Sequence, residues 1–162
     1  MARTVIKLNQ AIKRAQYILD RHPGYSMENR GTHLDAPMFD CSSFVGTVWD
    51  VWDAPGHRPA TPNMAAAYRA AGFDVYTYGD TRSYGRLKKG DILVHNGAQG
   101  GAGADGHTAM IWIDGGIIES TGGIGVHTTR FYEYNWQIVI RGQGGIEIVK
   151  WTGQNPWSMP GY

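Results

Sequence analysis

The chain has 162 residues, of which 42% are hydrophobic and 18% are charged, and its formal net charge is +1. This length fits one domain. The proportion of hydrophobic to charged residues excludes a disordered chain, because disordered chains are poor in apolar residues and highly charged. Acidic and basic residues are interleaved without a basic stripe for nucleic acid, and the single cysteine, Cys41, excludes both an intramolecular disulfide and a zinc site built on several thiolates.

The first half of the chain has the apolar periodicity of helices. Apolar residues recur at steps of three and four over residues 5–19, which predicts an amphipathic helix. After a loop, Asp40 stands at an N-cap position and predicts a helix over residues 41–52. A shorter helix is predicted over residues 62–72, because Pro62 suits the first turn of a helix.

The second half of the chain has short apolar runs broken by glycine, which are typical of strands. The predicted strands cover residues 73–78, 91–95, 107–113, 116–120, 136–140 and 146–149. Helices that precede strands predict an α+β fold with an antiparallel sheet. Residues 1–150 are predicted to form this single domain, 151–162 a tail or the start of a linker, and the glycine-rich segment 96–106 a loop.

Cys41 occupies the predicted first turn of the second helix. Free backbone N–H groups and the helix dipole favour negative charge there, so this position predicts a lowered thiol pKa and a nucleophilic sulfur. The same N–H groups would stabilise an oxyanion formed on an attacked carbonyl. The alternative interpretation is a buried structural cysteine, which is the common role of a lone cysteine in an apolar environment.

His107 and Glu119 are the candidate partners of this thiol. A three-residue loop at 113–115 would place Ala109 opposite Glu119, so that His107 and Glu119 share one face of a hairpin as diagonal neighbours. Glu119 could then hold the imidazole of His107 in the tautomer that a general base needs. A two-residue loop would put Glu119 on the other face, and the alternative roles are a strand-end histidine and a solvated edge carboxylate.

Three segments in this order resemble the signature blocks of NlpC-type papain-like cell-wall peptidases. They are FDCSSFV at 39–45, LKKGDILV at 87–94, and GHTAMI at 106–111 followed by IIES at 117–120. Glu119 and Ser120 before a glycine-rich turn are further similar to the N-terminal peptidase domains of lysin A endolysins from phages of actinobacteria. The resemblance covers about residues 4–140 and implies a circularly permuted papain-like fold, with helices packed on an antiparallel sheet.

The resemblance also implies roles for single residues. Cys41 would be the nucleophile, His107 the base and then the acid, and Glu119 the residue that orients the ring, where many relatives have a histidine instead. Asp40 and Ser43 flank the nucleophile where relatives contact the stem peptide, although Asp40 is read first as a helix cap. Tyr25 lacks the tryptophan-glycine-glycine run that follows the corresponding tyrosine of relatives, which puts its contribution to the oxyanion hole in doubt.

The remaining histidines have no spacing that suggests a metal site, so no metal and no cofactor is expected. They are interpreted as loop or strand-end residues: His22, His33, His57, His95 and His127. No apolar run is long enough for a signal peptide or a membrane span, so we expect no membrane partner. A monomer is expected.

The predicted function is hydrolysis of peptide amides in bacterial peptidoglycan by a phage-type endolysin domain with a Cys-His-Glu triad. Such a protein would stay in the host cytoplasm until lysis and then act on the wall, and its partner would be the stem peptide. Three alternatives remain open. They are an N-acetylmuramoyl-L-alanine amidase with the same triad, a non-catalytic wall-binding or virion structural module, and a transferase or deamidase that acts on a protein.

Overall fold

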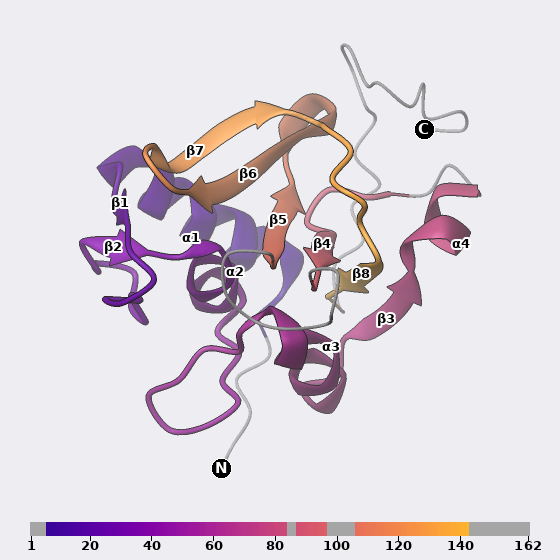
Figure 1. The fold of residues 1–162 in the computed structure, drawn as a ribbon, viewed down its shortest axis with the longest axis horizontal. Helices are drawn as coiled ribbons and strands as arrows, with labels where there is room; N and C mark the ends of the chain where they lie inside the picture. The colour runs from indigo at the N-terminus through magenta and orange to yellow at the C-terminus, as the bar shows by residue number, and fades with distance from the viewer. Residues whose placement is uncertain (1–5, 84–86, 97–105, 143–162) are drawn as a thin grey trace.

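The chain folds into helices followed by a sheet, as a computed structural model of residues 6–83, 87–96 and 106–142 describes it (Figure 1). In chain order, the elements are α1 (Leu8–Arg21), β1 (Gly24–Tyr25), β2 (Met38–Phe39), α2 (Cys41–Trp49), α3 (Thr61–Ala70), β3 (Asp74–Thr77), α4 (Tyr78–Ser83), β4 (Ile92–His95), β5 (His107–Ile111), β6 (Gly116–Thr121), β7 (Gly125–Arg130) and β8 (Ile138–Arg141). Of the helices in these segments, none is long and apolar enough to span a membrane.

A six-stranded antiparallel sheet organises the domain. Its strand order is β3-β8-β4-β5-β6-β7, and β1 and β2 form a separate parallel pair. Helix α2 packs against β5 and β6, α1 packs against α2 and β7, and α3 packs against β3, β4 and β8 (Figure 1). The predicted α+β fold with helices on an antiparallel sheet is therefore confirmed.

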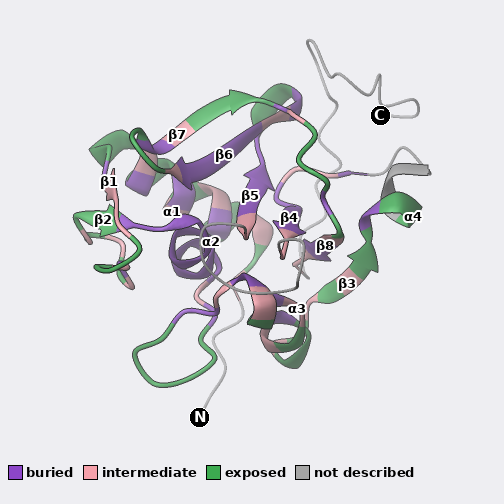
Figure 2. Ribbon diagram, viewed as in Figure 1, coloured by how far each residue is buried: buried purple, intermediate pink, exposed green. Residues whose placement is uncertain are grey.

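Both faces of the central strands are buried, as Figure 2 shows for β4, β5 and β6. Alternate residues of β4, such as Ile92 and Val94, pack with the helices, whereas Leu93 packs on the other face with Trp136 and Tyr78. This alternation follows from the pleat of a strand. Because both faces of the sheet are covered, side chains of β5 pack between the helices on one face and a second apolar cluster on the other.

Several predicted boundaries differ from the structure. The helix predicted over 41–52 ends at Trp49, because Asp50 adopts a left-handed conformation with φ 53°. The sequence interpretation did not include β1, β2, β7 or α4. The predicted strand 146–149, the tail 151–162 and residues 97–105 of the glycine-rich segment lie outside the described residues.

Helix α2 offers a test of its packing at Thr47. All nine residues of α2 are buried, and the Thr47 hydroxyl has no hydrogen-bond partner among the described residues. Burying an unsatisfied hydroxyl is costly, so the isosteric change Thr47→Val is expected to raise the free energy of unfolding by about 1 kcal/mol. Chemical denaturation measures this change, and a destabilised variant would contradict the packing described.

Candidate active site

Cys41 is the first residue of α2, as the sequence predicts. The Asp40 carboxylate accepts a hydrogen bond of 2.8 Å from the backbone N–H of Ser43, and the Ser43 hydroxyl accepts one of 3.0 Å from the backbone N–H of Asp40. This reciprocal pair is a capping box, and it satisfies backbone donors that the helix itself leaves unpaired. The first turn, and with it the position of the sulfur, is therefore fixed by the residues on either side of the cysteine.

The thiol is not the resting anion that its helix position predicts. Burial raises the pKa of Cys41 to about 12, and the negative charge of Asp40 acts in the same direction. The backbone amides of Thr108 and Ser42, which donate hydrogen bonds to the sulfur, and the charge of Arg30 oppose this rise only in part. The predicted lowering of the thiol pKa is therefore wrong for the free protein, because desolvation outweighs the helix terminus.

The raised pKa makes a direct prediction about ionisation. A group whose pKa lies far above neutral is protonated at neutral pH, so Cys41 should contribute no thiolate absorbance until the solution is strongly alkaline. Ultraviolet difference spectra between the wild type and Cys41→Ala measure the thiolate separately from tyrosine. Thiolate absorbance that is already present at neutral pH would contradict a neutral resting thiol.

The hairpin β5–β6 brings His107 and Glu119 together as predicted. The connection Ile113–Gly115 has three residues, with positive φ at Asp114 and Gly115. The register pairs Met110 with Ile118, which fixes the face that Glu119 shares with His107. Nε2 of His107 lies 2.8 Å from Oε1 of Glu119.

This contact fixes the tautomer of His107. A carboxylate accepts only, so Nε2 carries the proton that it donates to Glu119, and a neutral ring then has its lone pair on Nδ1. No described residue forms a hydrogen bond with Nδ1. The ring of Trp136 stacks on the imidazole at a centroid distance of 5.8 Å, and Tyr134 meets it edge-on. Within the described residues, His107 therefore keeps an unoccupied acceptor at Nδ1.

Strand β5 also connects His107 to the surroundings of Cys41. The backbone amide of Thr108, the residue after His107, donates to the sulfur of Cys41. Helix α2 also packs directly against β5. The sulfur therefore lies next to the backbone at the start of β5, so the structure brings Cys41 and the strand of His107 together at one point of the fold.

Two further side chains surround Glu119, and the sequence interpretation assigned a role to neither. The Tyr132 hydroxyl donates to Oε1 at 2.6 Å, and Nε2 of His127 lies 3.0 Å from Oε2. Burial alone would raise the pKa of Glu119, but the hydrogen bonds from His107 and Tyr132 and the charges of both histidines lower it below its ordinary value. Among the described residues, no group of three or more His, Cys, Asp or Glu side chains is arranged to hold a metal ion.

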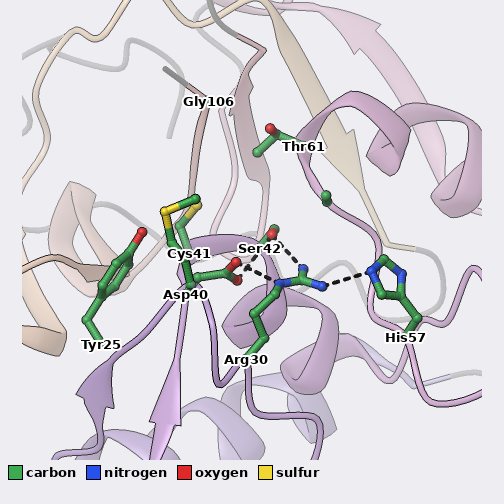
Figure 3. A pocket seen from close by; sticks show the side chains of 10 residues that line it. Tyr25, Arg30, Asp40, Cys41, Ser42, His57, Thr61 and Gly106 are labelled. Carbon is green, nitrogen blue, oxygen red and sulfur yellow. Dashed lines mark hydrogen bonds and ion pairs between the residues drawn. The ribbon is translucent and has the colours of Figure 1, made fainter. Parts of the chain in front are cut away.

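Cys41 faces a cleft of about 410 Å³ (Figure 3). Its lining is formed by Tyr25, Met27, Arg30, Asp40, Cys41, Ser42, His57, Ala60, Thr61 and Gly106. Tyr25 and Asp40 thus line the same cleft as Cys41. Ser43 does not line the cleft, because it is fully buried and its hydroxyl serves the capping box.

Arg30 organises one wall of this cleft, and no motif pointed to it. Its guanidinium donates to the Asp40 carboxylate at 2.7 Å and to the Ser42 hydroxyl at 2.9 Å (Figure 3). It also lies 3.1 Å from Nε2 of His57, whose Nδ1 lies 2.6 Å from Asp53. The Asp40 carboxylate is therefore shared between the cap of α2 and the wall of the cleft.

The fold is similar to solved NlpC/P60 structures. No protein-family model and no curated protein matches the sequence. An NlpC/P60 family protein from Bacillus cereus has a TM-score of 0.55 at 19% identity, with 85% of this chain and 40% of that chain covered. NlpC1 from Trichomonas vaginalis has a TM-score of 0.53 at 18% identity, with 86% and 46% covered.

The P60 domain of an antigen from M. avium subspecies paratuberculosis has a TM-score of 0.51 at 16% identity, and the match covers 85% of this chain and 97% of that domain. The chain thus spans less than half of the first two proteins and nearly the whole of this domain. Identities this low establish the fold and no more. The chain has an α+β fold of the NlpC/P60 type.

Proposed function

We propose that the protein is a cysteine amidohydrolase that cuts an amide in the peptide part of bacterial peptidoglycan. Cys41 is the nucleophile, His107 the general base and then the general acid, and Glu119 the residue that orients His107. The hydrogen bond between His107 and Glu119 carries this proposal, because it leaves Nδ1 of His107 free to accept a proton. His107 is the first residue of β5, and the backbone amide of the next residue, Thr108, contacts the Cys41 sulfur. The NlpC/P60-type fold supports the class of substrate.

The reaction begins from a neutral thiol and a neutral imidazole. As the sulfur attacks the carbonyl carbon of the amide, Nδ1 of His107 takes the thiol proton. The imidazolium then gives this proton to the leaving nitrogen, the C–N bond breaks, and a thioester to Cys41 remains. A water molecule that His107 deprotonates attacks the thioester carbonyl carbon, the C–S bond breaks, and the peptide leaves with a new carboxyl group. His107 returns the proton to the sulfur and restores the free thiol.

The developing oxyanion can accept a hydrogen bond at the start of α2. The amide of Ser43 donates to the Asp40 cap and that of Ser42 to the sulfur, which leaves the backbone N–H of Cys41 at the helix end, where negative charge is favoured. Tyr25 lines the same cleft, and its pKa is raised by burial and by the charges of Cys41 and Asp40, so its hydroxyl stays protonated and can donate. Tyr25 is thus retained as an oxyanion donor in this mechanism.

Mass spectrometry of digested cell walls tests the substrate and the bond. Purified walls treated with the protein should release fragments with new α-amino groups and carboxyl groups inside the stem peptide or crossbridge. Free lactyl carboxylates on muramic acid would instead identify the alternative N-acetylmuramoyl-L-alanine amidase. Walls left unchanged by a folded protein would overturn the proposal and favour a silent wall-binding or virion module.

We further propose that the domain acts as a phage endolysin. The similarity of the segment around Glu119 and Ser120 to actinobacterial lysin A domains supports this source. Protein expressed inside actinobacterial cells should then leave them intact until the membrane is permeabilised, after which the culture should clear. Equal clearing without permeabilisation would contradict an enzyme that waits in the cytoplasm for access to the wall.

A further inference from the structure

The imidazole of His127 lies between two hydrogen-bond acceptors. Its Nδ1 is 2.9 Å from the backbone carbonyl of Gly125, and its Nε2 is 3.0 Å from Oε2 of Glu119. A neutral imidazole has one N–H group, so it can satisfy only one of these contacts and would turn a lone pair toward the other acceptor. An imidazolium donates a hydrogen bond to the Gly125 carbonyl from Nδ1 and pairs its positive charge with the Glu119 carboxylate at Nε2.

The alternative, a protonated Glu119 that donates to a neutral His127, conflicts with the surroundings of the carboxyl group. Oε1 already accepts hydrogen bonds from His107 and Tyr132, and these donors lower the pKa of Glu119 despite its burial. We propose that His127 is held as an imidazolium, that it balances the charge of Glu119, and that it thereby keeps His107 neutral until His107 takes the proton of the thiol. His127 is then a positioning residue of the triad, and this catalytic meaning rests on the proposed function.

The backbone fixes this arrangement. Glu119 and His127 are directly paired across β6 and β7, so their side chains leave the sheet on the same face. Gly125 has φ 81°, and a Cβ at this position would meet the carbonyl oxygen of Pro23 at 2.2 Å, so the backbone that presents the Gly125 carbonyl has little freedom. The side chain of His127 is 19% exposed, and that of Glu119 is 4% exposed. His127 can therefore exchange its proton with solvent, whereas Glu119 is screened from it.

The other groups around this cluster do not supply the missing charge. Tyr132, from the segment after β7, and Tyr134, which packs on His107, end in hydroxyl groups and cannot supply a positive charge. Helix α1 packs on β7 through its apolar side, and β1 brings Tyr25. On the α2 side, Arg30 is paired with Asp40. With Glu119 counted as negative, His127 is the cation in direct contact with it while His107 is neutral.

The charge balance has a consequence for the base. A carboxylate without a second cation beside it favours the charged form of His107, in which Nδ1 has no lone pair for the thiol proton. The imidazolium of His127 beside Oε2 of Glu119 cancels much of this attraction, so His107 stays neutral and its Nδ1 keeps its lone pair. This suits a mechanism that starts from a neutral thiol, because the base must be free when the substrate arrives.

Nitrogen-15 NMR of the histidine side chains of the whole chain tests the proposal without any substrate. At neutral pH, both ring nitrogens of His127 should resonate as protonated nitrogens, and these signals should be absent from His127→Gln. In that variant the glutamine keeps an N–H donor but not the charge, so the pH at which His107 protonates should rise. The exposed His33 provides the matched control, because His33→Gln should leave the titration of His107 unchanged.

Each outcome decides the inference. A neutral His127 in the wild type would overturn it, whether or not the variant folds. An unchanged titration of His107 in a folded His127→Gln variant would overturn the proposed effect on the base. Wall digestion by the wild type is measured separately. A failure of the proposed function would show as undigested walls, whereas a failure of this inference would show in the NMR signals of His127 and His107. If the walls are cut, the acidic limb of kcat/KM should move upward in His127→Gln by the same shift.

Discussion

Replacing Cys41 by alanine is expected to reduce wall hydrolysis by about 10³-fold or more, because the variant has no atom that can form the thioester. The change removes one sulfur from a nearly buried position and leaves the capping box of Asp40 and Ser43 intact. Turbidity assays and zymograms with the purified variant measure the loss.

Two controls separate chemistry from folding. Cys41→Ser keeps the shape of the side chain but has a much poorer nucleophile, so it should be nearly as inactive as Cys41→Ala. Thr47→Val alters the same buried helix away from the cleft and should retain activity. Clearing by Cys41→Ala equal to that of the wild type would refute the enzyme assignment.

The second large effect is expected at Glu119. In Glu119→Gln the amide can turn its NH₂ group toward His107, which favours the tautomer with the proton on Nδ1 and leaves no base for the thiol. A comparable carboxylate-to-amide change in a serine protease triad costs about 10⁴-fold in kcat, and we expect a loss of about 10²–10⁴-fold here. Steady-state rates on soluble wall fragments measure it.

Tyr132→Phe is the matched control for this variant. It removes a hydrogen bond to the same Oε1 of Glu119 but keeps the carboxylate and its contact with His107. The loss in Tyr132→Phe should therefore be much smaller than in Glu119→Gln. Equal losses, or full activity of Glu119→Gln, would mean that the carboxylate does not orient the base.

The hairpin that builds the site could be predicted because its geometry is local. A three-residue loop fixes which residues share a face, and the predicted pairing of Ala109 with Glu119 follows from the observed register of Met110 and Ile118. The first turn of α2 is also local, since Asp40 caps it three residues from Ser43. Short-range rules of turns and caps are therefore sufficient to predict where Cys41, His107 and Glu119 lie in their elements.

The missed elements lack such signals. Strands β1 and β2 have two residues each, which is too short for any periodicity. Strand β7 is buried at only its first two residues and is polar and largely exposed beyond them, so its apolar pattern is weak. Gly122 and Gly123, in the turn before β7, are the signal that could have indicated the hairpin and placed His127 opposite Glu119.

The remaining errors come from contacts between distant segments. Arg30 and His57 reach the cleft from loops without a motif. The sequence predicts a low thiol pKa if the helix terminus is the dominant influence. In the structure the thiol is buried, and burial together with the neighbouring charge of Asp40 reverses the direction of the pKa shift. Desolvation depends on the packed fold, so local sequence patterns do not predict it.

The covalent intermediate on Cys41 is the most direct evidence for thiol catalysis. The enzyme is mixed with soluble wall fragments, quenched in acid during turnover, digested, and examined by mass spectrometry. We expect an acyl fragment of the stem peptide on the peptide that contains Cys41, and we expect no such adduct in Cys41→Ala. Continuing hydrolysis with no adduct on Cys41, or with an adduct on another residue, would contradict thiol catalysis by Cys41.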